Sequence, residues 1–376
     1  MQLSVWEKES FFAPADVLIA GSGFVGLWSA YYLKKNNPSL KITVVDRGVI
    51  PTGASTRNAG FACFGSPTEL MGDVNSMGEN NMLELVEMRH TGISRIQKLF
   101  GKREIDFDGC GGYEMINAVS PERYDQLHDQ LHWLNKHLSS ITHKKETFAF
   151  ADNKIKKFGF NNVAHLIKTT QEGSLHPGKL CQKLLQRVQK MGVNVLSGVE
   201  IKHYEPGENG ITLSTDKHFR LSAGKIIICT NAFAKQLLPG LDINPARGQV
   251  LVTAPIPSLK IKGTFHFDEG YYYFRNLGNR LLLGGARNSA PGQEGTLHLD
   301  ITDNIQQKLE AFISDHLLPG TPFQVTDRWS GIMGMGVEKM PIVRKISDNV
   351  FCAVRMSGMG VALAPVVGKK IAEMVD

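Results

Sequence analysis

Cysteine is scarce in this chain of 376 residues, and the few cysteines are not spaced as a metal site or a redox pair. There are five of them, an odd number, and no C-x-x-C occurs. They stand at Cys63, Cys110, Cys181, Cys229 and Cys352. This pattern argues against a zinc ribbon and a disulfide framework, and it favours a reducing compartment. We therefore expect a cytoplasmic protein without a metal site.

The sequence also lacks long apolar runs and a strong excess of basic charge. No apolar run reaches the length of a membrane span. The first ten residues contain Glu7, Lys8 and Glu9 but no apolar segment, so a secretory signal is not expected. The net charge of +6 is small, whereas nucleic-acid binding would need a larger clustered basic patch. We expect neither a membrane span nor a nucleic-acid partner.

Glycine, in contrast, is plentiful and forms one informative motif. The stretch 17–26 reads VLIAGSGFVG. Its glycines, Gly21, Gly23 and Gly26, have the spacing G-x-G-x-x-G. The first allows a tight turn, the second lets backbone approach a pyrophosphate, and the third lets a helix pack closely on a strand. Apolar residues before the motif predict a buried strand, and residues 27–35 predict a helix whose N-terminus can bind phosphate.

A second predicted strand, residues 41–46, ends in an acidic residue. Asp46 stands about 20 residues after the last glycine of the motif, the spacing at which dinucleotide-binding folds place an acceptor for ribose hydroxyls. Its negative charge would repel a 2′-phosphate, which disfavours NADP. The alternative is an ordinary strand–helix–strand unit with an aspartate on the surface.

The rest of the chain contains two kinds of pattern. Residues 180–232 alternate helices with buried apolar runs, which indicates a parallel sheet. Residues 245–325 contain repeated alternating strands, which indicates an antiparallel sheet in a second lobe. Residues 69–100 have helical periodicity, and residues 349–374 return to strand, glycine turn and helix. The length also exceeds one ordinary domain, so two lobes are expected.

Motifs in many parts of the chain point to one family. They are DVLIAGSGFVG (16–26), VVDRG (44–48), GASTRNAG (53–60), HPGKL (176–180), CTNAFA (229–234), RGQ (247–249), YYYFRNLGNRLLLGGAR (271–287), RWSGIMG (328–334) and MSGMGVALAPVVGKKIAE (356–373). Together they resemble the flavin-dependent amine and amino-acid oxidoreductases of the D-amino-acid oxidase superfamily. These include glycine oxidase, sarcosine oxidase and the γ-glutamylputrescine oxidase-like enzymes. The motifs GASTRNAG and YYYFR…GGAR favour the last of these branches.

The resemblance implies FAD and a set of residues that would bind it. Those residues are Gly21, Ser22, Gly23, Phe24 and Val25 at the glycine turn, Asp46 and Arg47 at the adenosine, Val199 at adenine, Thr230 and Asn231 near the phosphates, Ala54, Ser55, Arg57, Asn58, Ala59 and Gly60 beside the isoalloxazine, and Met356, Ser357, Gly358, Met359, Gly360 and Val361 at the pyrimidine ring. The last group would form a helix N-terminus, which stabilises the negative charge of reduced flavin.

Two positions depart from the family pattern. Amino-acid oxidases of this family usually hold the substrate carboxylate with an arginine in a G-[LI]-R-P segment, and here Met333 replaces it. A bidentate clamp is absent there, so a simple α-amino acid is a less suitable substrate. The arginines that could substitute are Arg57, Arg275 and Arg287. Leu282 stands where sarcosine-oxidase relatives carry an oxygen-activating lysine. Their flavin-linked cysteine has no counterpart in 328–334, so FAD should be non-covalent.

Three side chains are catalytic candidates. His266 lies in a predicted strand and is a candidate base or substrate-orienting group, although a surface or satisfied core histidine is the alternative. Tyr273 shares one face of its strand with Tyr271 and would line the pocket, unless it packs between the lobes. Arg287 follows a Gly-Gly pair and could bind an acidic substrate.

These observations predict an α/β fold with a Rossmann-like FAD-binding domain and a second, antiparallel-sheet substrate domain of α+β character. The FAD-binding domain would comprise residues 15–80, 163–240 and 326–376. The substrate domain would comprise residues 81–162 and 241–325.

The expected activity is oxidation of a C–N bond in a small amine or amino acid, by hydride transfer to flavin N5. Oxygen or another electron acceptor would then reoxidise the flavin. The alternative is a flavin-dependent dehydrogenase of a hydroxy acid or amino acid that passes electrons to a quinone or a partner protein. A flavoprotein that binds a ligand without turnover is a third option, which the intact motifs disfavour.

Overall fold

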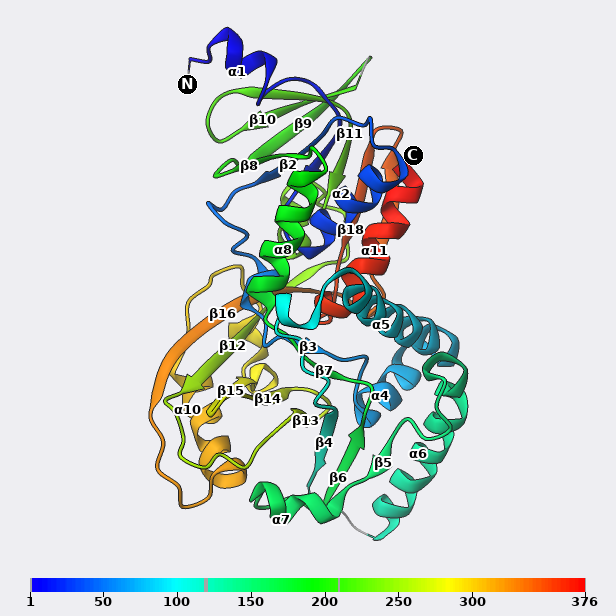
Figure 1. Cartoon of the computed structure of the whole chain (residues 1–376), viewed down its shortest axis with the longest axis vertical. Helices are drawn as coiled ribbons and strands as arrows, with labels where there is room; N and C mark the ends of the chain where they lie inside the picture. Colours follow the sequence, from blue (N-terminus) through cyan, green and yellow to red (C-terminus); the bar gives the residue numbers. More distant parts are fainter. Residues whose placement is uncertain (1, 118–120, 209, 376) are drawn as a thin grey trace. The chain divides into compact units, whose positions relative to one another are not determined.

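The computed structural model describes residues 2–117, 121–208 and 210–375, which pack into two compact units. The first unit comprises Met1–Arg57, Pro177–Ala246 and Met333–Asp376, and the second comprises Asn58–His176 and Arg247–Ile332. Each unit is built from segments far apart in the sequence, as the blue, green and red parts of the first unit show (Figure 1). Strands β12 (Asn244–Thr253) and β16 (Val325–Met335) carry the chain from one unit into the other.

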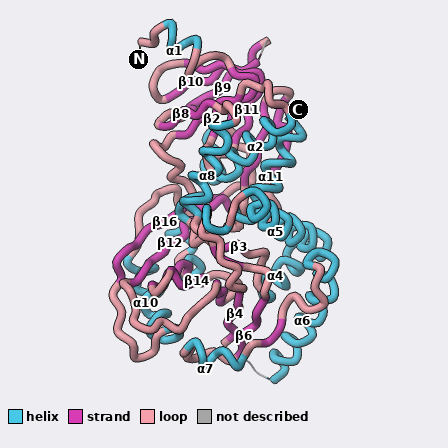
Figure 2. The backbone as a smooth tube through the Cα atoms, viewed as in Figure 1, coloured by secondary structure: helices cyan, strands magenta, loops and turns pink. Residues whose placement is uncertain are grey.

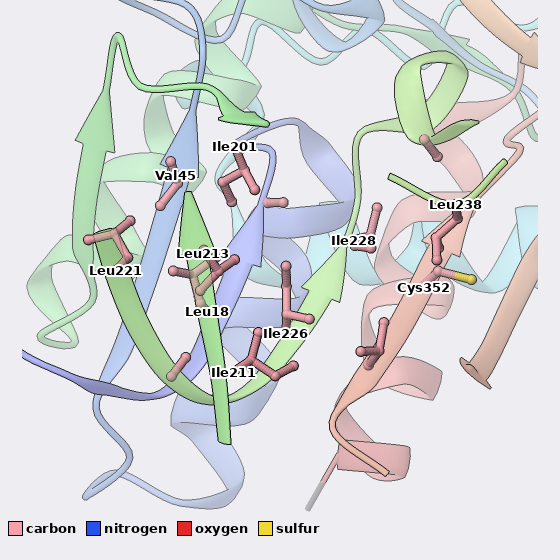
Figure 3. Close-up of a cluster of buried hydrophobic side chains, with 14 of the residues drawn as sticks. Leu18, Val45, Ile201, Ile211, Leu213, Leu221, Ile226, Ile228, Leu238 and Cys352 are labelled. Atoms are coloured by element: carbon pink, nitrogen blue, oxygen red, sulfur yellow. The ribbon is translucent and has the colours of Figure 1, made fainter. Parts of the chain in front are cut away.

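The sheet of the first unit is mostly parallel. In the order of the sheet, its strands are β17 (Ile342–Ser347), β18 (Val350–Val354), β11 (Arg220–Ile228), β1 (Ala15–Ala20), β2 (Ile42–Asp46) and β8 (Asn194–Ser197), and β10 (Gly210–Thr215) and β9 (Ile201–Gly207) extend it beside β11. Strand β1 pairs in parallel with β11 and β2, whereas β17, β10 and β9 pair antiparallel. Leu18, Ile226 and Ile228 lie in the buried core of this sheet (Figure 3).

Three helices of the first unit pack side by side against the sheet (Figure 1). They are α2 (Phe24–Asn36), α8 (Pro177–Lys190) and α11 (Gly360–Val375), and the shorter helices are α1 (Val5–Glu9), α3 (Ala54–Arg57) and η3 (Asn231–Gln236). Helix α2 contacts both α8 and α11. A Cβ on Gly368 would lie 2.6 Å from the Cβ of Trp28, so glycine allows α11 to lie close to α2.

The second unit contains a mixed, mainly antiparallel sheet with helices around it (Figure 2). In the order of the sheet, its strands are β16, β12, β15 (Arg280–Gly285), β14 (Tyr272–Leu277), β13 (Thr264–Phe267), β4 (Gly112–Ile116), β6 (His165–Thr169) and β5 (Ala149–Phe150), and β3 (Phe61–Ala62) pairs separately with β7 (Gly173–Ser174). The helices are α4 (Pro67–Met77), α5 (Glu79–Leu99), η1 (Lys102–Glu104), α6 (Pro121–Thr142), η2 (Asp152–Lys154), α7 (Ile155–Phe158), η4 (Arg287–Ser289), α9 (Pro291–Glu294), α10 (Asp303–Phe312) and η5 (Ile313–Leu317).

The two faces of this second sheet differ in composition. Phe265 and Phe274 lie on one face and pack with Phe312 of α10 in a large apolar core. Residues one position away along the strands point to the other face, because side chains alternate along a strand. His266 and Tyr273 therefore share the face opposite this core.

The structure confirms the predicted α/β fold class and corrects one detail of it. The helical stretch expected over 69–100 is two helices, α4 and α5, because Gly78 interrupts it with φ of 82°. The compact units differ from the predicted domain limits, since residues 58–80, 163–176 and 326–332 pack within the second unit and residues 241–246 within the first. Assignment of the first three segments to FAD binding remains a prediction. No helix among the described residues has the length and apolarity to cross a bilayer.

Candidate functional site

The glycine-rich turn between β1 and α2 has a backbone that tolerates few side chains. Gly21 has φ of 107°, a conformation that residues with a Cβ rarely adopt. A Cβ on Gly26 would lie 1.9 Å from the carbonyl oxygen of Gly21, so a larger residue there would push α2 away from the turn. The backbone at the N-terminus of α2 is therefore not covered by side chains of the glycine turn. Its free N–H groups suit a phosphate group.

The Asp46 carboxylate at the end of β2 closes this turn. Its Oδ2 accepts hydrogen bonds from Ser22 N–H at 2.8 Å and from Ser22 Oγ at 2.7 Å, and its Oδ1 accepts from Gly48 N–H at 2.9 Å. The side chain is only partly buried, so its remaining lone pairs can accept ribose hydroxyls. Val199 lies beside it and donates its N–H to the Asp46 carbonyl at 2.9 Å.

Two further predicted residues lie at the ends of β2 and α2. Ser55 Oγ accepts the Phe24 N–H at 2.8 Å and so caps α2, whose N-cap residue Gly23 has no side chain to do so. The Arg47 guanidinium lies 3.7 Å from the centre of the Phe233 ring, a cation–π contact. The structure therefore brings the predicted segments around 23 and 55 together and places Arg47 against η3, the turn that follows β11.

The ends of β11 and β18 lie at the same edge of the sheet, because parallel strands end at one edge. A Cβ on Gly21 would lie 3.6 Å from the backbone nitrogen of Thr230. Asn231 Oδ1 accepts the N–H of Arg355 at 3.2 Å and that of Met356 at 3.4 Å. The Asn231 side chain therefore joins the turn after β11 to the turn after β18.

The turn after β18 leads into the N-terminus of α11. Ser357 and Gly358 have φ of 46° and 84°, and the helix begins at Gly360. Met333 lies at this turn, since a Cβ on Gly358 would be 3.5 Å from its sulfur. The first turn of α11 provides backbone N–H groups without helical partners, as the predicted pyrimidine-binding segment 356–361 requires.

Two buried hydroxyls at this edge of the sheet indicate that a ligand can bind there. Thr230 Oγ1 and Ser357 Oγ are shielded from water and have no hydrogen-bond partner among the residues that the structure describes. A buried polar group without a partner costs about 1–3 kcal/mol, and the oxygens of a bound ligand would remove that cost. With the glycine turn, Asp46 and two helix N-termini, this edge fits a dinucleotide such as FAD.

In the second unit, one face of the sheet carries the catalytic candidates. Tyr273 pairs with His266 on one side and with Gly284 on the other, and paired residues share a face. A Cβ on Gly284 would lie 2.8 Å from Tyr273 Oη, so the glycine leaves room for the tyrosine ring. The Phe61 ring, which no sequence motif indicated, packs edge-on against both, with centres 5.2 Å from His266 and 6.1 Å from Tyr273.

Arg287 belongs to the same group of side chains. Its guanidinium lies 4.9 Å from the centre of the Tyr271 ring. Burial raises the pKa of Tyr273 to about 12, and the charge of Arg287 opposes that rise. Tyr273 is therefore a neutral hydroxyl at physiological pH. Tyr272 points to the opposite face and stacks on Phe312 at 4.6 Å, as the predicted alternation requires.

An apolar wall lies beside these polar groups. Its buried members are Ala59, Val250, Val252 and Leu282, with Phe61, Tyr273 and Trp329 packed against them. The Asn58 side chain accepts the Gly60 N–H at 2.8 Å and fixes the turn that carries Ala59. The predicted flavin-side residues 58–60 therefore pack on the face that carries His266.

A buried charge cluster also lies at this face, and most of its members were not predicted from the sequence. Its members are Glu69, Arg89, Glu114, Glu172 and His266, each at most 8% exposed. Burial raises the pKa of Glu114 to about 7 and that of Glu172 to about 8, and it lowers the pKa of His266. Of the unpredicted members, only Glu114 is marked by the local sequence, because it is a charged residue within the otherwise apolar strand β4.

The chain belongs to the FAD-dependent oxidoreductase family. The family model described as "FAD dependent oxidoreductase" matches residues 16–374. The chain is 24% identical to the probable oxidoreductase OrdL of Haemophilus influenzae, over 96% of this chain and 83% of that protein. It is also 24% identical to the gamma-glutamylputrescine oxidoreductase of Escherichia coli, with the same coverage of 96% and 83%.

Solved structures share the fold over nearly the whole chain. L-proline dehydrogenase from P. horikoshii has a TM-score of 0.77 at 16% identity, covering 96% of this chain and 93% of that one. Glycine oxidase from Geobacillus kaustophilus has a TM-score of 0.76 at 19% identity, covering 96% and 94%. At these identities the likeness establishes the fold.

Proposed function

We propose that the protein binds FAD non-covalently and oxidises a C–N bond of a small amine. The bound flavin would supply the acceptor of a hydride, at its N5, from the carbon next to the substrate nitrogen. Support for non-covalent binding comes from β16, where no cysteine stands between residues 328 and 334. Cys63, Cys181, Cys229 and Cys352 are buried, Cys110 is partly exposed, and none of the five stands on β16.

The proposed substrate class rests on the position of Met333, whose sulfur lies at the Gly358 turn. Relatives that oxidise amino acids place a carboxylate-binding arginine at this position. A carboxylate without a partner loses several kcal/mol when it leaves water for an apolar site. A neutral amine avoids that loss, and so does an amine whose carboxylate lies far from the reacting carbon and reaches Arg287. Such substrates include γ-glutamyl-type polyamine derivatives.

Each catalytic candidate would have a distinct task. His266 would accept the proton of the substrate ammonium, because only the neutral amine releases a hydride from its carbon. Its lowered pKa keeps the ring neutral and able to accept a proton. The Tyr273 hydroxyl would orient the substrate nitrogen, and Arg287 would bind a distal carboxylate.

The test compares rates of anaerobic flavin reduction by different substrates. We expect amines, including γ-glutamyl polyamines, to bleach the flavin faster than glycine, sarcosine or D-alanine. Met333→Arg should move the ranking toward the amino acids, because it supplies a bidentate partner for the carboxylate. Met333→Leu, which keeps the position apolar, should leave the ranking unchanged. A small α-amino acid that reduces the flavin at least about tenfold faster than every amine, a difference of 1.4 kcal/mol in barrier, contradicts the proposal.

A second candidate differs in the electron acceptor. Leu282 is a buried leucine where sarcosine-oxidase relatives carry an oxygen-activating lysine, which favours a quinone or a partner protein over oxygen. The enzyme reduced in the same experiment can be mixed with oxygen or with an artificial acceptor. Slow reaction with oxygen beside fast reaction with the artificial acceptor supports a dehydrogenase.

A further inference from the structure

Glu69 of α4 and Arg89 of α5 form an ion pair within the buried charge cluster. Arg89 Nη1 lies 3.5 Å from Glu69 Oε1 and donates a hydrogen bond to the Phe64 carbonyl at 3.1 Å. Arg89 is fully buried, and its Nε and Nη2 have no hydrogen-bond partner in the part of the chain that the structure describes. Replacing a buried ion pair by apolar residues often stabilises a protein, so stability alone does not explain this pair.

The Glu69 carboxylate and the His266 imidazole both lie beside Gly270. A Cβ on Gly270 would lie 3.7 Å from His266 Nδ1 and 3.9 Å from Glu69 Oε2. His266 Nδ1 is thus the ring nitrogen that lies near the same glycine as the Glu69 carboxylate. The other ring nitrogen, Nε2, is buried and has no partner among the described residues.

Titratable or charged groups approach His266 from four neighbouring elements. They are Glu69 on α4, Arg89 on α5, Glu114 on β4 and Tyr273 on β14. Burial is the main cause of the lowered pKa of His266, Glu69 opposes it, and Arg89 adds to it. Glu114 accepts hydrogen bonds from Ser66 and Thr68. Tyr273 is neutral near pH 7, and Glu114, with a pKa of about 7, is only partly charged there. The other charges of this group are those of the Glu69–Arg89 ion pair.

We propose that Glu69 is a positioning residue for His266 and that Arg89 holds Glu69 in place. The inference rests on the proposed function, in which His266 accepts the ammonium proton of the substrate. The Glu69 carboxylate keeps the proton of the neutral imidazole on Nδ1 and leaves the lone pair on Nε2. When the substrate ammonium arrives, its N–H bond breaks as the Nε2–H bond forms. Glu69 balances the positive charge that this transfer creates on the ring.

The first measurement follows His266 itself, by NMR titration of the FAD-bound enzyme labelled with ¹⁵N-histidine. We expect Glu69→Gln to lower the titration midpoint of His266 by about half a pH unit or more, because a favourable negative charge is lost. The Nδ1-protonated form should lose its dominance, and Glu69→Asp should restore both in part. Glu87→Gln, which removes an exposed carboxylate from α5, should change neither.

A second variant covers the case in which Glu69→Gln does not fold because Arg89 is left without its partner. In Glu69→Gln/Arg89→Met both charges are absent. The preference for the Nδ1-protonated form should still be lost, because the carboxylate is absent from the ring's surroundings. An unchanged midpoint and an unchanged tautomer in these variants overturn the proposal.

The pH dependence of kcat/KM separates this inference from the proposed function. We expect the acid limb of the profile to move to lower pH together with the His266 midpoint. A purely structural role of Glu69 would lower activity at every pH without moving the limb. If the midpoint moves and the limb does not, Glu69 positions the ring, but the role of His266 as proton acceptor is wrong.

Discussion

At the scale of single residues, the Asp46 carboxylate makes contacts that bear on cofactor binding in two ways. It accepts hydrogen bonds from Ser22 and Gly48, and its free lone pairs would accept the ribose hydroxyls of FAD. Asp46→Ala should weaken FAD binding by about 1.5–3 kcal/mol, or roughly tenfold and more, because charge-assisted hydrogen bonds are lost. Titration of the apoprotein with FAD, followed by flavin fluorescence, measures this change.

A matched variant separates the effect of Asp46 on the shape of the turn from its direct binding of the ribose. Ser22→Ala removes the Oγ hydrogen bond to Asp46 but keeps the carboxylate, so it should weaken FAD binding less than Asp46→Ala. Equal losses in the two variants would mean that Asp46 acts only by shaping the turn. Unchanged FAD affinity in Asp46→Ala would remove the residue from the site.

At the scale of elements, Glu172 connects two short strands. It precedes β7, which pairs with β3, and its Oε1 accepts the N–H of Phe64 at 2.8 Å and that of Gly65 at 3.3 Å. Burial raises its pKa from 4.5 to about 8, so the folded state holds a proton that the unfolded state releases. Between about pH 5 and pH 8 the free energy of unfolding therefore falls as pH rises, by up to about 1.4 kcal/mol per pH unit.

Glu172→Gln should flatten this dependence, because the amide cannot ionise and its oxygen can still accept both N–H groups. Urea unfolding at several pH values between about 5 and 8 checks the slope. Glu172→Ala should instead lower stability at every pH, since it leaves two buried N–H groups without acceptors. A Glu172→Gln slope as steep as that of the unchanged protein would show that Glu172 is ionised in the fold. Glu114, whose pKa is also raised, likewise makes the free energy of unfolding fall as pH rises. Its contribution remains in both variants.

The elements also show what could be predicted from the sequence. The strands at 17–20 and 41–46 and the turn between them follow from local patterns, since apolar runs and glycine spacing act over a few residues. The parallel pairing followed from the same patterns. The buried charge cluster could not be predicted in this way. Its residues come from α4, α5, β4, β13 and the position before β7. Glu69 and Arg89 stand on amphipathic helices, where charges are usually solvated.

At the scale of the whole molecule, cofactor binding should be reversible and should stabilise the fold. Acid precipitation should release FAD and leave a yellow supernatant, because no cysteine is available at the β16 position of relatives with covalent flavin. The apoprotein should unfold at a lower temperature than the holoprotein, and added FAD should restore the difference through mass action. Calorimetry with and without FAD measures this shift, and yellow colour that stays with the pellet contradicts non-covalent binding.

The discontinuous make-up of the first unit also determines when it can form during synthesis. Its first segment ends at Arg57 and its third begins at Met333. Until the ribosome has delivered β18 and α11, the edge of β11 is unpaired and the face of α2 around Trp28 is uncovered. Such nascent surfaces are prone to aggregation and are handled by chaperones. The cradle around Thr230 and Ser357 is likewise incomplete until then, which makes cofactor loading one of the last events in the maturation of the protein.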